Sequence, residues 1–239
     1  MAIDHEAPAR RRRCYLVRHG HVEYFDAQGR PLDPRSVSLS PKGVEQATAL
    51  GAVLQGTHFD RVLVSDYPRA QETLSLLLGD RAAPIETRTE LREIRAGRLR
   101  EIPAPGLREA VIGAYSGAAE PGASFLGGER WSDFSQRVLG TFLELLEDDS
   151  WQCALVVSHD AVNRVLLAWA TGIGLPGIAA FEQDYACLNV LDVDSHGRQR
   201  YGASLRALNF TPYDPHKAGL HDTVLESLYR AIQPSGLRA

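Results

Sequence analysis

Short apolar runs of strand length alternate along this chain with segments of helical periodicity. Strands are expected at 14–18, 61–65, 153–158, 187–193 and 202–208, and helices at about 41–55, 68–78, 131–146 and 160–170. Because parallel strands are usually connected through a helix, this alternation is typical of a parallel sheet that is covered on both faces. We therefore expect an α/β fold, a three-layer α/β/α sandwich with a mostly parallel central sheet.

The length and composition indicate one domain with additions. The chain has 239 residues, of which 44% are hydrophobic, and this is enough for a single large core. Residues 1–13 are expected to be a flexible basic leader, because Arg10–Arg13 follow a polar start. Residues 14–239 are expected to form the domain, with an inserted lid at about 98–130 that is rich in Gly, Pro and Ala.

A C-terminal helix is expected at about 223–232. Thr223 and Glu226 have the spacing of a capping box, and Leu225, Leu228 and Ile232 lie on one helical face. That face is expected to pack either on the domain or on a partner subunit. A homodimer is one expectation that follows.

Several classes of function are disfavoured. The net charge is -4 and the pI is about 6.1, so no global basic field indicates a nucleic acid or an anionic membrane as partner. No apolar stretch approaches the length of a membrane helix, and no signal peptide is apparent, so we expect a cytoplasmic protein. The three cysteines lie in apolar runs without a C-x-x-C pair, which indicates reduced thiols and no cysteine metal site.

Polar residues follow three of the expected strands at the point where each strand ends. Arg18-His19-Gly20 ends the first strand, Ser65 to Arg69 follows the second, and His159-Asp160 follows the strand at 153–158. Ligands of open α/β sheets bind outside the carboxyl ends of the strands. We therefore expect these three loops to converge on one site.

The residue types at these ends suit a phosphoryl group. Guanidinium groups match phosphoryl oxygens, so Arg18 and Arg69 are candidate clamps. One imidazole can act as nucleophile if a ring nitrogen is unprotonated, and a backbone carbonyl near Gly20 can fix that tautomer for His19. A leaving alkoxide also needs a proton, so a carboxylic acid with a raised pKa is expected nearby. His216 and His221 fit no standard metal motif, and neither a metal nor another cofactor is expected.

At this point the chain resembles a known family, the histidine phosphatase superfamily, in the branch with the cofactor-dependent phosphoglycerate mutases. The resemblance covers roughly residues 14–210 and is carried by several motifs in order along the chain. These are Arg18-His19-Gly20, the stretch 39–47 (LSPKGVEQA), the stretch 64–73 (VSDYPRAQET), Leu91-Arg92-Glu93-Ile94 with Gly97, Gly127-Gly128-Glu129 with Arg137-Val138, and Val157-Ser158-His159.

The resemblance implies a phosphoglycerate mutase-like fold, no metal, and a role for each matched residue. His19 is similar to the family's phosphorylated nucleophile, and His159 to the second histidine of the pocket. Arg18 and Arg69 are similar to its phosphate clamps. Glu93 is similar to its proton donor, although Glu90 and Glu101 are near enough in sequence to compete.

The chain departs from the family pattern in three places. Many members continue the first motif as Gly-Glu-Thr-x-x-Asn, whereas His21, Val22 and Phe25 stand at those positions here, and His21 is a candidate substrate contact. Asp160 replaces a common glycine, and it either caps the helix at 160–170 or adds a substrate-binding carboxylate to the pocket. The mutase-type Gly-Trp-x-Asp stretch is missing.

The sequence therefore predicts a metal-independent phosphatase that hydrolyses a small phosphorylated metabolite through a phosphohistidine intermediate. A phosphoglycerate-type mutase is one alternative, and a non-catalytic phospho-ligand binding protein of the same fold is another. The sequence leaves the identity of the phosphomonoester open.

Overall fold

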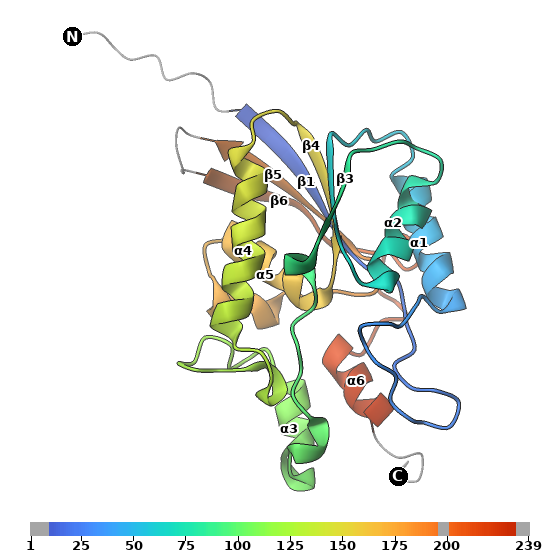
Figure 1. Ribbon diagram of the computed structural model, residues 1–239, viewed down its shortest axis with the longest axis vertical. Helices are drawn as coiled ribbons and strands as arrows, with labels where there is room; N and C mark the ends of the chain where they lie inside the picture. Colours follow the sequence, from blue (N-terminus) through green and yellow to red (C-terminus); the bar gives the residue numbers. More distant parts are fainter. Residues whose placement is uncertain (1–9, 196–200, 233–239) are drawn as a thin grey trace, which may run out of the picture.

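A six-stranded mixed sheet runs through the centre of the molecule (Figure 1), in the order β3-β2-β4-β1-β5-β6. The computed structural model describes residues 10–195 and 201–232. The strands are β1 (Arg10–Arg18), β2 (Arg61–Ser65), β3 (Ile85–Arg88), β4 (Cys153–Ser158), β5 (Leu188–Ser195) and β6 (Tyr201–Phe210). The four strands β3, β2, β4 and β1 are parallel, whereas β5 and β6 join the sheet antiparallel, so the α/β expectation is confirmed.

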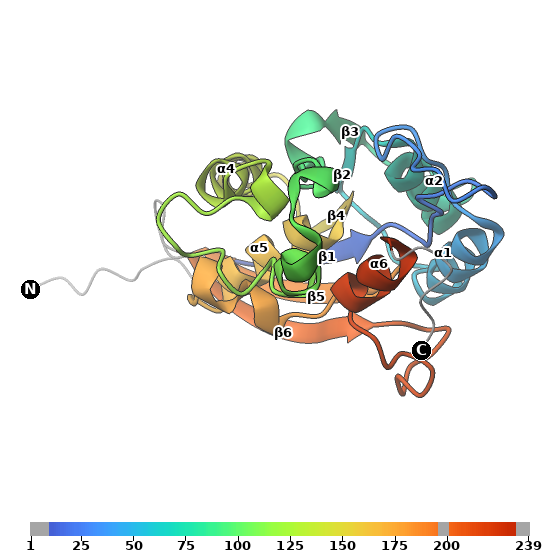
Figure 2. The same cartoon turned by 90° about the horizontal axis from the view of Figure 1, so that it is seen from below.

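Helices cover both faces of the sheet (Figure 2). On one face lie α1 (Pro41–Val53) and α2 (Pro68–Leu78), and on the other lie α4 (Trp131–Glu147) and α5 (Asp160–Ala170). Successive residues of a strand point to opposite faces. In β4, Ala154 and Val156 join the core under α4 and α5, while Leu155 and Val157 join the core under α1 and α2. This double burial explains the near-continuous apolar run of β4.

One strand is absent from the sequence-based prediction. β3 forms the edge of the sheet beside β2 and consists of Ile-Glu-Thr-Arg, whose side chains are alternately exposed and half-buried. An edge strand with little burial carries no apolar run, so hydrophobic patterning does not find it.

The expected boundary of the basic leader is wrong. Arg10–Arg13 belong to β1 and pair with β5, where Asp192 lies opposite Arg13 and makes a two-point ion pair with it. Arg12 is 1% exposed, and its guanidinium lies 4.6 Å from the centroid of the Trp151 ring. The carboxylate on β5 and the ring supply partners that local sequence does not reveal, so the charged run continues the strand. Residues 1–9 lie outside the described residues.

The insert at 98–130 and the C-terminal helix lie together at one end of the molecule (Figure 1). The expected insert at 98–130 contains short helical turns and α3 (Leu107–Ile112), which contacts the tail helix α6 (Val224–Ile232). The capping box of α6 is confirmed, because Thr223 and Glu226 exchange hydrogen bonds. Leu225 is buried against the domain's own core. Within the described ranges, no helix is both long and apolar enough to span a bilayer.

Candidate active site

The register of the sheet brings the two histidines together. In the parallel pair of β1 and β4, Arg18 lies opposite Ser158, so the next residues, His19 and His159, leave the sheet side by side. Their ring centroids are 5.1 Å apart. β2 pairs with the other edge of β4 and ends at Ser65, which places the third loop beside them. The expected convergence of the three strand ends is confirmed.

The loop after β1 fits tightly against the start of α1. A Cβ on Gly20 would lie 2.5 Å from the carbonyl oxygen of Gly43, and a Cβ on Gly43 would lie 2.1 Å from that of His21. Ser40 caps α1 by accepting a hydrogen bond from the Gly43 N–H at 3.2 Å. Only glycine allows this approach, which fixes the backbone that carries His19.

His19 is held in one tautomer with one unprotonated ring nitrogen. Its Nδ1 lies 2.7 Å from the Gly20 carbonyl oxygen, which can only accept, so Nδ1 carries the hydrogen. Its Nε2 then accepts from Nε of Arg69 at 3.1 Å. Burial, with the neighbouring charge of Arg69, lowers the pKa of His19 well below its usual value of 6.5. The ring is therefore neutral at physiological pH and presents a basic nitrogen.

Arg18 and Arg69 are buried cations that lack a carboxylate partner. They are 3% and 1% exposed, and among the described residues neither forms an ion pair. Arg18 donates to the Gln183 carbonyl at 2.6 Å and lies 3.9 Å from the centroid of the Tyr185 ring, while its Nε has no partner within the described ranges. Burying a charge without a counter-ion is costly. Two such guanidinium groups therefore indicate that an anionic ligand completes the site.

His159 completes the site from the α5 side. Its Nδ1 lies 3.2 Å from Nη2 of Arg69 and accepts from it, so its Nε2 carries the hydrogen and lies 2.8 Å from Oγ of Ser65. Burial and the charge of Arg69 lower the pKa of His159 well below its usual value. Arg69 therefore contacts both imidazoles and fixes their relative position.

Glu93 places a buried carboxyl group beside the start of α5. Its Oε1 accepts from the N–H groups of Ile94 at 3.0 Å and of Ala161 at 3.2 Å. Burial, with the nearby carboxylate of Asp160, raises the pKa of Glu93 to about 7. The raised pKa agrees with the expected carboxylic acid, and the role of Glu93 as proton donor stays a prediction. By contrast, Glu101 is exposed and pairs with Arg98 at 3.2 Å.

Arg137 and Glu129 together hold the segment that carries Glu93 in position. Arg137 of α4 binds the carboxylate of Glu129 at 2.9 Å and donates to the carbonyl of Glu93 at 3.3 Å. Glu129 also accepts from the Arg95 N–H at 3.1 Å. A Cβ on Gly128 would lie 2.2 Å from the Arg95 carbonyl oxygen. The motif around 127–129 and Arg137 therefore acts on the site through the position of Glu93.

His21 lies at the rim. Its Nδ1 is 2.8 Å from Oγ of Ser40, and its ring packs edge-on against Tyr185 at 5.0 Å between centroids. The side chain is 22% exposed. The contact between His21 and the substrate stays a prediction.

The expected capping role of Asp160 is wrong. His159 is the N-cap residue of α5, and Asp160 is the first residue of the helix, without a capping hydrogen bond. Its Oδ1 accepts from Arg164 at 2.6 Å and its Oδ2 from the Tyr115 hydroxyl at 2.8 Å. The cap was expected because the local sequence does not reveal that Tyr115 and Arg164 bind this carboxylate.

Aromatic residues that the sequence reasoning missed surround the histidines and arginines. The Tyr67 ring lies 4.7 Å from the Arg69 guanidinium and edge-on to His159, and Tyr185 stacks on Arg18. Tyr24 is close enough for the charges of both arginines to act on it, although burial raises its pKa overall. Tyr24 and Tyr67 could have been found from the sequence, because both lie in the loops that carry the motif residues. Tyr185 has no motif of its own.

A site that presents a neutral imidazole, two buried cations without an ion pair and a carboxyl group with a raised pKa at one edge of an α/β sheet suits enzymes that act on phosphomonoesters. The fold and the site together place the protein in this class of enzymes. The chain belongs to the histidine phosphatase superfamily, branch 1, whose model matches residues 14–202. Its activity class is phosphoric monoester hydrolase. Within the described residues, no group of three His, Cys, Asp or Glu side chains is arranged to hold a metal ion.

Characterised relatives span most of the chain. The adenosylcobalamin/α-ribazole phosphatase of Escherichia coli is 32% identical over 199 residues, which cover 82% of this chain and 95% of that protein. A broad-specificity phosphatase of Saccharomyces cerevisiae is 29% identical, covering 66% and 69%. The crystal structure of a putative α-ribazole-5'-P phosphatase from E. coli superimposes with a TM-score of 0.67 at 31% identity, covering 83% of this chain and 96% of that one.

Proposed function

We propose that this chain hydrolyses a small phosphomonoester at the site between His19 and His159, through a phosphohistidine intermediate on His19. The observation that carries the proposal is the pair of buried arginines without a counter-ion, beside a neutral imidazole. A dianionic phosphoryl group supplies the missing charge, and the guanidinium forks match its oxygens.

In the first step, Nε2 of His19 attacks phosphorus in line with the leaving oxygen. The new N–P bond forms as the O–P bond breaks, and Glu93 gives its proton to the departing oxygen. Arg18 and Arg69 donate hydrogen bonds to the equatorial oxygens, whose charge is thereby stabilised. His159 donates to them from Nδ1 once Arg69 has turned to the phosphoryl group and the ring hydrogen has moved to Nδ1, with the Ser65 hydroxyl then donating to Nε2. Arg69 must give up its contact with the His19 Nε2 as the phosphoryl group enters.

In the second step, water attacks the phosphohistidine. Glu93 is now a carboxylate and accepts a proton from the water as the new O–P bond forms and the N–P bond breaks. Inorganic phosphate leaves, His19 regains its free Nε2 and Glu93 regains its proton. One carboxyl group thus acts as acid and then as base, which suits a pKa of about 7. We assign Asp160 no contact with the phosphoryl group, because both of its oxygens are already bound.

We further propose that the substrate is a ribosyl phosphate with an aromatic base, such as α-ribazole phosphate. The E. coli relatives with that name support this choice, since they are covered over almost their full length. The tyrosines at 24, 67 and 185 also support it, because aromatic rings near Arg18 and Arg69 can stack on a flat base.

The test is a screen of metabolite phosphates in the presence of EDTA, with His19→Ala as control. We expect release of inorganic phosphate by the wild type and none by the variant, with α-ribazole 5'-phosphate turned over at a higher kcat/KM than simple sugar phosphates. If a sugar phosphate is hydrolysed better, the substrate assignment is wrong and the reaction stands. If no phosphomonoester is hydrolysed, the proposed function is wrong.

The same screen separates the mutase alternative. Incubation with 3-phosphoglycerate and bisphosphoglycerate is expected to release phosphate slowly or not at all, and to give no isomer. Rapid isomerisation without free phosphate would replace the phosphatase assignment by a mutase. A lid function of 98–130, a homodimer and a cytoplasmic location stay predictions.

A further inference from the structure

The proton donor of the site lies beside a residue that the family pattern does not supply. Glu93 accepts a hydrogen bond from Ala161, and the residue before Ala161 is Asp160. The first N–H groups of a helix favour a negative carboxylate, so the start of α5 alone would favour the charged form of Glu93. That form is wrong for a group that must first donate a proton. Asp160 adds a negative charge at the same helix end and opposes this effect.

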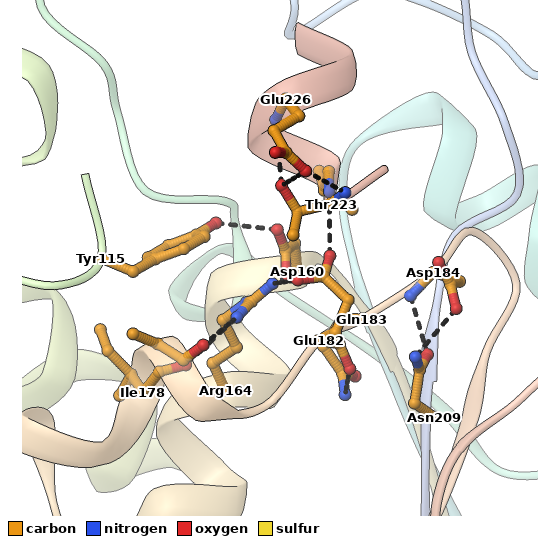
Figure 3. Close-up of polar contacts among 12 residues, drawn as sticks. Tyr115, Asp160, Arg164, Ile178, Glu182, Gln183, Asp184, Asn209, Thr223 and Glu226 are labelled. Carbon is orange, nitrogen blue, oxygen red and sulfur yellow. Dashed lines mark hydrogen bonds and ion pairs between the residues drawn. The ribbon is translucent and has the colours of Figure 1, made fainter. Parts of the chain in front are cut away.

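Asp160 is buried and fixed from two sides (Figure 3). It is 2% exposed, and its oxygens accept from Nε of Arg164 at 2.6 Å and from the Tyr115 hydroxyl at 2.8 Å. Arg164 is 1% exposed and also donates to the Ile178 carbonyl at 3.2 Å and to Glu182 at 3.0 Å. The buried carboxylate therefore has its counter-ion, and the counter-ion has further partners, as a stable buried pair requires.

The hydrogen bonds around Asp160 and Arg164 extend to the insert at 98–130 and to the tail helix α6. Tyr115 belongs to the insert, where its ring packs against Phe125 and Trp131 at 5.9 and 5.6 Å between centroids. The other oxygen of Glu182 accepts from the N–H of Val224, the first residue of α6, at 2.9 Å. Hydrogen bonds thus connect the neighbour of the proton donor with the insert and with the tail helix.

We propose that Asp160 is a positioning residue for proton transfer, a carboxylate fixed by Tyr115 and Arg164 beside Glu93 that keeps the acid in its proton-donating form until substrate binds. This inference rests on the proposed phosphatase reaction and on the role of Glu93 in it. Asp160 acts through Glu93 and leaves the phosphoryl group to Arg18 and Arg69.

The groups that face Glu93 agree with this assignment. The charged ones are Arg18 of β1, Arg69 of α2 and Asp160 of α5, and Arg137 of α4 donates to its backbone carbonyl. The titratable but neutral ones are Tyr24 of the 21–36 loop and Tyr115 of the insert. The two arginines near the carboxyl lower the pKa of Glu93, whereas burial and Asp160 raise it. Asp160 is the charged residue that offsets the arginines.

The test is the pH dependence of kcat/KM in Asp160→Asn. The amide keeps the shape and can still accept from Arg164, but the negative charge is gone. We expect the basic limb of the profile to move to lower pH by about one unit, which is about a tenfold loss of kcat/KM at a fixed pH above the limb. At acidic pH the loss should be small. KM should stay within about twofold, because Asp160 does not contact the phosphoryl group.

A second variant protects the test from a failure to fold. Asp160→Asn leaves the Arg164 charge without its closest partner, so the double variant Asp160→Asn/Arg164→Gln removes both charges from the core together. It is expected to shift the limb in the same direction. The control is Asp222→Asn, which removes a carboxylate that precedes the tail helix and pairs with Arg230. Within the described residues it makes no hydrogen bond or ion pair with Glu93 or Asp160, so its loss should leave the limb unchanged.

The outcomes separate this inference from the proposed function. A wild type without phosphatase activity overturns the function itself. An active wild type whose basic limb is the same in the folded Asp160 variants overturns the positioning role alone. A uniform loss of kcat/KM at all pH values also contradicts it, since a structural defect would lower activity without moving the limb.

Discussion

Glu93 determines how the activity should depend on pH. Its pKa of about 7 means that the free protein loses the donated proton as pH rises through neutrality, so kcat/KM should fall above about pH 7. The pKa of His19 lies well below 6.5, so the nucleophile stays neutral on the acid side and its own limb should lie well below that pH. Initial rates with an alkyl phosphate between pH 5 and pH 9 measure the basic limb.

Glu93→Gln separates the acid from the rest of the site. The amide cannot donate a proton to an alkoxide, so kcat/KM for an alkyl phosphate should fall by about 10² to 10⁴-fold. With p-nitrophenyl phosphate the loss should be much smaller, because nitrophenolate leaves without a proton. An equal loss with both substrates would contradict the role of Glu93 as the acid.

At the scale of residues, most of the candidate site could be proposed from the sequence. His19, Arg18, Arg69 and His159 follow strand ends or begin a helix, and parallel strands bring such positions together. The partners of Asp160 could not be predicted, because Tyr115 reaches it from an insert without clear periodicity, 45 residues away. Long-range contacts of this kind leave no pattern in one sequence.

At the scale of elements, α4 positions the segment that carries Glu93. Arg137 holds Glu129 and the Glu93 carbonyl with one planar fork, and a lysine cannot hold both at once. Arg137→Lys should therefore lower kcat by about tenfold to a hundredfold, because a small displacement of a catalytic group is costly. Steady-state kinetics with Arg130→Lys, an exposed arginine that precedes α4, provides the matched control.

KM in Arg137→Lys is expected to stay near the wild-type value, since the arginine clamps are untouched. An unchanged kcat would show that the Glu93 segment keeps its position without the Arg137 fork.

The elements themselves were predicted where periodicity or apolar runs are strong. The strand at 153–158 and the helix at 160–170 have the expected bounds. The errors fall at charged strand segments, namely β3 and the first residues of β1, where pairing with neighbouring strands overrides local composition.

At the scale of the whole molecule, stability depends on two cores on opposite faces of one sheet. Phe134 of α4 is 0% exposed in the core that also supports Trp131 and α5. Phe134→Ala should lower the free energy of unfolding by about 3–5 kcal/mol, through lost burial and the cavity left behind. Val53→Ala, at a position that is 50% exposed, should change it by less than about 0.5 kcal/mol. Urea unfolding followed by circular dichroism measures both, and similar losses in the two variants would contradict this account of the core.

The central claim is that His19 accepts the phosphoryl group, and a trapping experiment tests it most directly. The protein is mixed with ³²P-labelled phosphomonoester, quenched within one turnover, and digested under alkaline conditions, in which phosphohistidine survives. We predict label that is lost in acid, in the peptide that contains His19, and no label in His19→Ala. Label on His159 or on a carboxylate, or turnover without any labelled protein, would contradict the account.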